Sequence, residues 1–548
     1  MRPDGTGTAH FYGNYTMHPG VQTEAQPIPG SHIVVSTAAA HHYITAGSLI
    51  LIDTRKGEDG LEPITRLTPE IPWPESEGWK LPGCYASPYP VNDTLFFASF
   101  SAETLAQPES ERTTVNPWGA WPTSKAYGLW LVDALGGREL IYQDSEIGTF
   151  TPIPIRKRAR PPVIPSVLPP TESAPDFGVC YVENVYDCRE PLEKGGIKYL
   201  RVNELLNQPA AKKCNRNAGR DLDLYKRPLG VVPVAEDGSV AFRIPARKPI
   251  QLQALNAEGM AVFTMRSFIY AQKGEVLGCA GCHEDKMRSR PPQDMPKRRE
   301  FVDPEPMLTL GYEGGFSFMR TVQPVFDRHC IRCHGLVPAE KGGKEPLNLI
   351  GAQAGPNLIS RKQIKWIESY EETGVSKTND CFAIASPLTA LLKKGHNGIT
   401  LSKDEWTALI LWMDLNVPHY SDGHYGFNCD EQKQPDPDGE KRLRAAIETQ
   451  FGKEIAGQPF AALVNVAAPE KSRILLAALP LEKGGWGQFS DGFKGTDDPN
   501  YRAMLARVRE AIAPLDYHDF CGTCGRGKSC VCNSCWVWMG HFNDPVGR

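Results

Sequence analysis

Residues 276–283 read Val-Leu-Gly-Cys-Ala-Gly-Cys-His, and residues 327–334 read Asp-Arg-His-Cys-Ile-Arg-Cys-His. Both stretches end in Cys-x-x-Cys-His. This spacing lets two thiols bond to neighbouring positions on the rim of a flat macrocycle while the adjacent imidazole binds its central iron from one face. Two copies are hard to ascribe to accident, since at this His frequency a His would follow both pairs in roughly one chain in two thousand.

The two motifs predict two covalently attached haem c groups. The attachment cysteines and proximal histidines are expected to be Cys279, Cys282 and His283 for the first haem, and Cys330, Cys333 and His334 for the second. An alternative is one structural zinc ion bound by all four cysteines. The pairs are 48 positions apart, far beyond the roughly 15–20 of zinc ribbons, which disfavours zinc.

The second haem needs a sixth ligand or an open site, and His396 in Lys394-Gly-His-Asn-Gly398 is the expected ligand. It precedes a predicted helix, where single-haem cytochrome folds commonly present a distal ligand. The rivals are His419, His424 and Met413. Met413 shares a helix face with apolar residues, which favours a core position. His329 directly precedes Cys330 and is not expected to reach the same iron.

The first haem has no evident distal ligand in its own segment. Met287, Met265 and Tyr270 are nearby, and packing is the expected role of the last two. A five-coordinate iron could bind a diatomic molecule or a small nitrogen compound, which is the physical route to an enzyme here.

Composition sets limits on class. Lys and Arg total 60 against 64 Asp and Glu, so nucleic acid is not an expected partner. No run of 18 apolar residues is present to span a bilayer. Fifteen cysteines and covalent haem indicate an exported, periplasmic protein. The opening Met1-Arg-Pro-Asp-Gly lacks the apolar region of a signal peptide, so we expect the N-terminal sequence to be incomplete.

Hydrophobic patterning predicts a multidomain β plus α protein. Gly47–Asp53 and Gly128–Asp133 repeat one motif, an apolar strand closed by Asp, with Asp53 and Asp133 80 positions apart, as two propeller blades would require. The expected domains are a partial β-propeller (1–150), a Pro-rich linker (151–172), a β-sandwich-like domain with the first haem (173–300), a mostly helical cytochrome c-like domain with the second (301–428), and a C-terminal extension with a Cys-rich tail (429–548).

Two hydrophobic patterns predict the secondary structure of the middle domains. Val240, Phe242 and Ile244 alternate with polar residues behind an Asp237-Gly238 turn, and the pattern resumes on both sides of residues 256–259, which predicts antiparallel strands. Trp406, Leu409, Ile410 and Met413 then follow at helical spacing. Ser402 and Glu405 form a capping box at the expected start of this helix.

The remaining cysteines and one His pair are ambiguous. The tail holds Cys521, Cys524, Cys530, Cys532 and Cys535, which suit zinc, an iron–sulfur cluster or two disulfides; no His follows either pair, which disfavours a third haem. Cys180 and Cys188 could pair as a disulfide. His41-His42 could face a haem, although a structural role is more common for such a pair.

Residues 1–428 together resemble the hydrazine synthase alpha subunit-like family of multidomain haem proteins. The matching segments are Pro27-Ile-Pro-Gly-Ser-His32 with His41-His42, Arg160-Pro-Pro-Val-Ile-Pro165, Met265-Arg-Ser267, Gly278–Glu284, Val322-Gln-Pro-Val-Phe326 and Trp412-Met-Asp-Leu-Asn416. The resemblance implies a propeller, a β domain with a catalytic-type haem at His283, and a cytochrome domain whose haem is bound by His334 and His396. The family has a tyrosine shortly after the first motif where this chain has Met287, which argues against hydrazine formation.

Three functions follow as hypotheses. The leading one is an exported dihaem cytochrome for electron transfer, with redox chemistry on a small nitrogen or oxygen species at the first haem. The second is a non-catalytic carrier whose propeller docks a redox partner protein or an additional subunit. The third is a zinc-stabilised interaction protein without haem.

Overall fold

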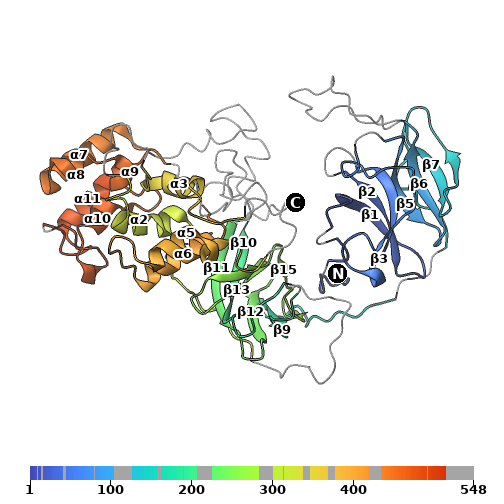
Figure 1. Cartoon of the computed structure of the whole chain (residues 1–548), viewed down its shortest axis with the longest axis horizontal. Helices are drawn as coiled ribbons and strands as arrows, with labels where there is room; N and C mark the ends of the chain where they lie inside the picture. Colours follow the sequence, from blue (N-terminus) through green and yellow to red (C-terminus); the bar gives the residue numbers. More distant parts are fainter. Residues whose placement is uncertain are drawn as a thin grey trace. The chain divides into compact units, whose positions relative to one another are not determined.

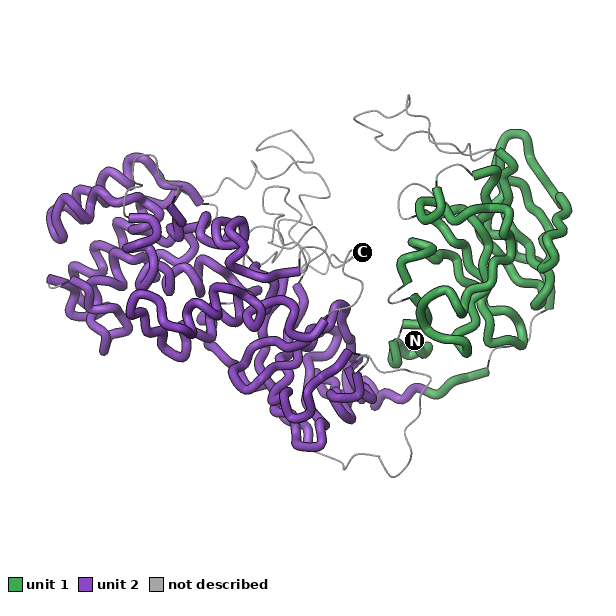
Figure 2. The backbone as a smooth tube through the Cα atoms, in the orientation of Figure 1, with its two compact units in different colours: residues 1–165, 285–289 green, residues 166–284, 290–548 purple. Residues whose placement is uncertain are grey.

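The computed structural model describes residues 1–8, 10–13, 16–40, 45–78, 81–103, 126–157, 160, 162–188, 190–206, 225–282, 300–312, 314–336, 346–367, 377–418, 433–489 and 491–513. These residues form two compact units, which Figure 2 distinguishes by colour. The first unit holds the described residues up to Pro165, and the second holds those from Ser166 onward. The chain is thus a multidomain β plus α protein, as its patterning predicts.

Two successive four-stranded antiparallel meanders make up the first unit (Figure 1). One consists of β1 (Val21–Pro27), β2 (Ile33–Ala39), β3 (Gly47–Asp53) and β4 (Ile64–Arg66), and the other of β5 (Cys84–Pro90), β6 (Leu95–Ser101), β7 (Gly128–Asp133) and β8 (Arg138–Tyr142). A single residue pair, Gly47 with Tyr85, joins them into one sheet. Gly47 suits this junction because a Cβ there would lie 2.1 Å from the carbonyl oxygen of Ala38.

The repeated Asp has a local cause in both meanders. Asp53 ends β3, and its carboxylate accepts from the amide of Arg55 at 3.2 Å. Asp133 ends β7 and accepts from the amides of Leu135 and Gly137 at 2.7 and 3.0 Å. Each carboxylate satisfies turn amides just as the ladder stops, which is the usual reason for Asp at such a position.

The second unit begins with a β-sandwich. One sheet has the order β11 (Tyr225–Pro233), β10 (Tyr199–Leu206), β13 (Pro249–Leu255), β14 (Ala261–Thr264), with β15 (Ile269–Tyr270) also on β13; the other has the order β12 (Val240–Pro245), β9 (Phe177–Val182), β16 (Val276–Cys279). Val202 and Ile250 from the first sheet and Phe242 from the second share one core. The predicted hairpin is confirmed for β13 and β14, whereas β12 pairs with β9 in the opposite sheet.

Helices follow the sandwich in chain order: α1 (Phe318–Thr321), α2 (Gln323–His329), α3 (Ala354–Ser360) after the 3-10 turn η6 (Gly351–Gln353), α4 (Phe382–Ala385), α5 (Pro387–Lys393) and α6 (Lys403–Asp414). Phe318, Phe326 and Trp412 meet at the centre of their core. The predicted capping box is confirmed, since the Ser402 hydroxyl accepts from the Glu405 amide and the Glu405 carboxylate accepts from the Ser402 amide.

Five further helices enclose a separate core. They are α7 (Pro437–Phe451), α8 (Lys453–Ala456), α9 (Phe460–Leu463), α10 (Arg473–Leu476) and α11 (Pro499–Glu510), with short 3-10 turns η9 (Pro469–Lys471) and η10 (Leu481–Lys483). The Asn465 side chain donates to the Met319 carbonyl at 2.6 Å, which anchors this layer on α1. Within the described residues, no helix is long and apolar enough to cross a membrane.

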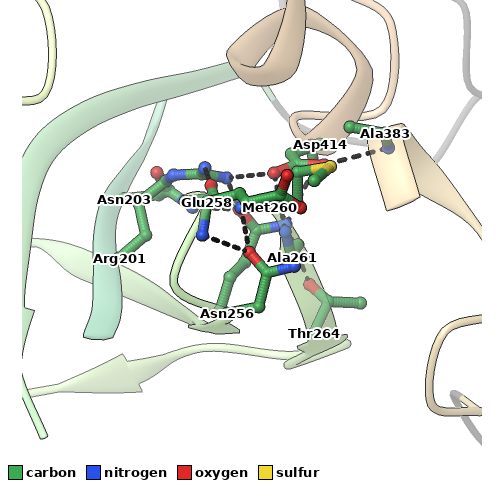
Figure 3. A network of polar contacts seen from close by, with 11 residues as sticks. Arg201, Asn203, Asn256, Glu258, Met260, Ala261, Thr264, Ala383 and Asp414 are labelled. Atoms are coloured by element: carbon green, nitrogen blue, oxygen red, sulfur yellow. Dashed lines mark hydrogen bonds and ion pairs between the residues drawn. The ribbon is translucent and has the colours of Figure 1, made fainter. Parts of the chain in front are cut away.

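A buried ion pair connects the sandwich to the helices (Figure 3). The Arg201 guanidinium on β10 lies 3.0 Å from the Asp414 carboxylate at the end of α6, and both side chains are 0% exposed. Arg201 also donates to Gln253 at 2.8 Å and to the Gly259 carbonyl at 2.7 Å. Asp414 in turn accepts from the amides of Ala261 and Ala383 at 2.9 and 3.1 Å. Among the described residues the Arg201 Nε has no hydrogen-bond partner, but the contacts to both terminal nitrogens of Arg201 and to both Asp414 oxygens offset much of the cost of burying the two charges.

The hairpin turn between β13 and β14 is shaped to reach this network. The Asn256 side chain accepts from the amides of Glu258 and Met260, both at 3.0 Å. Gly259 has a φ of +78°, a left-handed conformation that glycine adopts without steric cost. Met260 then enters the helical core beside the ion pair. The turn sequence Asn-Ala-Glu-Gly therefore positions a carbonyl for Arg201 and a side chain for the neighbouring core.

We expect Asp414→Ala to lower the free energy of unfolding of the second unit by roughly 3–5 kcal/mol, because Arg201 would keep a buried charge without a counter-ion. Denaturant unfolding followed by circular dichroism measures this. Asp497→Ala, which removes an exposed partner of Arg502, is the control and should leave the transition where it is. Equal stability of the native chain and Asp414→Ala would show that the pair does not hold the two layers together.

Candidate haem site

Helix α2 delivers the second Cys-x-x-Cys-His motif. Cys330 follows its last residue, and the helical path continues as the amides of Cys333 and His334 donate to the Cys330 carbonyl at 3.1 and 2.9 Å. This turn brings both thiols and the His334 ring to the same side of the chain. They line a cavity of about 320 Å³.

The cavity wall is mainly apolar. Its aliphatic and aromatic lining comes from α2, α3, α5, α6 and the loops between them: Val325, Phe326, Leu347, Leu349, Leu358, Leu388, Leu391, Leu392, Ile399, Leu401 and Leu409. An apolar, largely preformed pocket with a few convergent polar groups is the usual character of a cofactor site.

His396 faces His334 across this cavity, as expected from the sequence. The two ring centroids are 5.9 Å apart and the rings are nearly parallel, with an interplanar angle of 13°. A metal–imidazole nitrogen bond is about 2 Å long, so one metal atom fits between the two rings. With Cys330 and Cys333 beside them, the residues present fit a covalently held haem with two axial imidazoles.

The loop that carries His396 has a strongly constrained backbone. Gly395, Asn397 and Gly398 all have positive φ, at +84°, +50° and +72°. The Ile399 amide donates to the His396 carbonyl at 3.0 Å, which closes a turn directly before the capped helix α6. Glycine and asparagine are the residues that tolerate this conformation, so the Lys-Gly-His-Asn-Gly sequence has a structural reason.

Electrostatics favours the ligand form of His334. Burial lowers the pKa of His334, and the neighbouring His396 lowers it further. A lowered pKa keeps the imidazole neutral at physiological pH, and the neutral ring is the form that binds a metal. Burial raises the pKa of the Cys330 thiol to about 12, so this thiol is protonated before any reaction.

Met413 and His329 lie near the second motif and are within the described residues. Met413 is 0% exposed in the helical core, accepts a hydrogen bond from Thr389 at 3.8 Å and does not line the cavity, which agrees with the predicted core role. His329 does line the cavity, but its Nε2 lies 3.0 Å from the Glu405 carboxylate. His419 and His424 are outside the described residues.

Glu405 is a functional residue that sequence reasoning identified only as a helix cap. Its carboxylate holds His329 at 3.0 Å and Arg328 at 2.9 Å, and so braces the end of α2 against the start of α6. Burial raises the pKa of Glu405, but hydrogen bonds from His329, the Ser402 amide and Arg328 outweigh this and lower the pKa to about 2. No sequence pattern links residues 328 and 405, so only the fold could reveal the brace.

The first motif lies on the sandwich. Cys279 ends β16. The backbone of Cys282 forms an isolated β-bridge with the backbone of Cys188. Both motif cysteines pack against the sandwich core together with Cys180 and Cys188. Tyr270 is half-buried on β15. His283 and Met287 are outside the described residues, so the fit of a haem is tested at the second motif.

The single-zinc alternative gains no support from this arrangement. Cys279 and Cys282 pack on the sandwich core, whereas Cys330 packs on the helical core. In the described part of the chain, no three His, Cys, Asp or Glu side chains are grouped to hold a metal ion. No disulfide joins Cys180 and Cys188 in the described structure. The five tail cysteines and His41-His42 are outside the described residues.

Comparison with known proteins identifies the sandwich. Residues 195–284 match the family model described as the hydrazine synthase alpha subunit middle domain. In this segment the chain is similar to the middle domain of the hydrazine synthase alpha subunit. The matched segment runs from before β10 through the first Cys-x-x-Cys-His motif, and it confirms the family resemblance read from the sequence.

A solved structure of hydrazine synthase from Kuenenia stuttgartiensis is also similar. The two chains are 16% identical with a TM-score of 0.49, over 73% of this chain and 62% of that chain. This chain therefore spans less than two thirds of the length of that protein. A search of curated proteins gave no match.

The Glu405 brace predicts a pH-dependent contribution to stability. The carboxylate binds its proton less tightly when folded, so its contribution is present above pH about 4.5 and is lost as the pH falls toward 2. We compare the native chain with Glu405→Gln, which keeps an acceptor for the cap but removes the charge. The native advantage in unfolding free energy should be full at neutral pH and shrink toward pH about 3. Parallel stability curves for the two proteins would contradict the brace.

Proposed function

We propose that this chain is an exported dihaem c-type cytochrome that transfers electrons, and that it is itself a hydrazine synthase alpha-like redox enzyme acting on a small nitrogen or oxygen species. The observation that carries the proposal is the nearly parallel pair of His334 and His396, 5.9 Å apart beside Cys330 and Cys333. The family match over the middle domain supports the redox class.

At the second motif the chain supplies attachment, ligation and shielding. Cys330 and Cys333 would hold the haem through thioether bonds, and His334 and His396 would bind its iron from both faces. Haem with two imidazole ligands supplies one-electron transfer without an open coordination position. The apolar lining limits the access of water, and the Glu405 brace fixes the angle between α2 and α6.

We assign catalysis to the haem at the first motif. Cys279 and Cys282 would hold the first haem and His283 would be its ligand, with electrons passing between the two haems. Because Met287 stands where the family has a tyrosine, the reaction proposed is not hydrazine formation but redox chemistry on another small molecule. The substrate class is set by what a five-coordinate haem iron binds, a diatomic or small nitrogen compound.

The first unit would bind a partner protein and would not take part in catalysis. Its two four-stranded meanders suit two adjacent blades of a partial β-propeller, an architecture whose surfaces commonly bind other proteins. We assign to it the docking of a redox partner protein or an additional subunit. Covalent haem attachment argues for a periplasmic or otherwise exported location. The tail cysteines are assigned to zinc, an iron–sulfur cluster or disulfides.

Chain matured by a c-type haem attachment system should exceed its polypeptide mass by two haem groups and give a c-type pyridine haemochrome. Changing Cys330 and Cys333 together to Ser should reduce the haem content by half, since the first motif is intact. Cys381→Ser is the matched control, because Cys381 is half-buried in the same helical layer outside both motifs. A colourless protein of polypeptide mass would refute the proposal.

The coordination of each iron can be tested with carbon monoxide. In the reduced native chain we expect one haem, the first, to bind CO, because His396 occupies the sixth position of the second. His396→Ala should let both haems bind CO. His329→Ala, which alters the same cavity but removes a residue held by Glu405, should behave as the native chain does. No CO binding by the native chain would remove the catalytic part of the proposal and leave electron transfer alone.

A further inference from the structure

Four thiols gather at the first motif, and two of them belong to no haem-attachment sequence. Cys180 on β9 is fully buried, whereas Cys188, Cys279 and Cys282 are half-buried, and all four pack on the sandwich core. Cys180 and Cys188 come from a segment about 90–100 residues upstream of the motif. The fold therefore supplies each motif thiol with a neighbouring thiol from elsewhere in the chain.

Backbone pairing fixes the alignment of the two segments. Strands β9 and β16 are parallel, with Cys180 opposite Leu277 and Val182 opposite Cys279. Leu277 and Cys279 point to the same face of the sheet because side chains alternate along a strand, so the Cys279 side chain lies diagonal to that of Cys180. The pairing then continues beyond β16, as the amides of Glu183 and Asn184 donate to the carbonyls of Cys279 and Ala280 at 2.9 and 3.1 Å.

The motif itself is fitted to this neighbour. A Cβ at Gly281 would lie 2.0 Å from the Asp187 carbonyl oxygen, so the second variable position of Cys-Ala-Gly-Cys has room only for glycine. The backbone of the next residue, Cys282, forms a parallel β-bridge with the backbone of Cys188. The motif is therefore held against residues 180–188 along its length, and its thiols cannot move away from theirs without breaking these contacts.

The thiol of Cys180 is in direct contact with that of Cys279. A side-chain hydrogen bond with Cys279, together with burial, raises the pKa of Cys180 well above its usual range. Cys180 is thus a protonated, buried thiol, and the half-buried Cys279 is the one that an external reagent meets first.

We propose that Cys180 and Cys279 form a reversible disulfide that withholds Cys279 from haem attachment until it is reduced. Cys279 attacks a small-molecule disulfide such as oxidised glutathione, releasing one thiol and forming a mixed disulfide. Cys180 then displaces the second thiol. In sum, one S–S bond of the oxidant is exchanged for one S–S bond in the protein, and two protons and two electrons pass from the cysteine pair to the oxidant. A dithiol reductant reverses the exchange.

The disulfide itself is independent of the proposed function, and only its effect on haem attachment depends on it. The first experiment therefore uses the chain made without haem maturation. It is oxidised with oxidised glutathione, blocked with N-ethylmaleimide, digested, and analysed by mass spectrometry without reduction. We expect a Cys180–Cys279 peptide pair two hydrogens lighter than the sum of its parts.

Variants separate this pairing from its rivals. The linked peptide should disappear in Cys180→Ser and in Cys180→Ala, which also tests whether a polar group at this buried site unfolds the domain. It should persist in Cys188→Ser. Recovery of maleimide-labelled Cys180 after oxidation, a Cys180–Cys188 link, or stoichiometric zinc protecting these thiols would overturn the proposal.

The second experiment tests the consequence in cells with a c-type maturation system. Adding a thiol reductant during expression should raise haem occupancy at the first motif of the native chain, whereas Cys180→Ser should be fully occupied with or without it. The second motif is the internal control, read from its own peptide mass. Occupancy that is equal in all conditions would overturn the withholding role. If neither motif takes haem while the disulfide forms, the proposed function fails and the disulfide stands.

Discussion

The ion pair between Arg201 and Asp414 is the constraint on which the second unit depends. Neither charge is exposed, so each is stabilised mainly by the other, 3.0 Å away, and by hydrogen bonds with backbone amides, a carbonyl and a side-chain amide. Arg201 lies on β10, an inner strand of the five-stranded sheet, and Asp414 lies at the end of α6, which contributes to the cavity wall. The ion pair therefore couples the sandwich to the helical core within the second unit.

Helix α6 contributes to the cavity and to the contact with the sandwich in three ways. The beginning of α6 is capped by Ser402 and Glu405, and Glu405 also binds Arg328 and His329 just before the second motif. The loop immediately before α6 presents His396, and the end of α6 carries Asp414. One helix therefore positions an imidazole, braces the thiols opposite it and anchors the neighbouring domain. A site built this way owes its geometry to packed elements and not to a free loop.

Sequence reasoning succeeded where the signal is local. The capping box at Ser402, the strand ended by Asp53 and the hairpin across residues 256–259 all follow from short patterns, and the choice of His396 as a ligand, which stays a prediction, came from a loop position, and the structure places its ring 5.9 Å from that of His334. It failed where partners are remote. The pairing of β12 with β9, the helices from 437 to 476, the Glu405 brace and the juxtaposition of Cys180 with Cys279 depend on chain segments that no period connects.

The parallel pairing of β9 with β16 bears on where the middle domain begins. The family match starts at residue 195, yet β9 is the central strand of the three-stranded sheet, with β12 on one side and β16 on the other. A fragment cut at the matched boundary would leave those two strands without a common neighbour and half of the sandwich interior open to solvent. The sandwich therefore includes β9 (Phe177–Val182), and the matched segment is shorter than the set of strands that share its core.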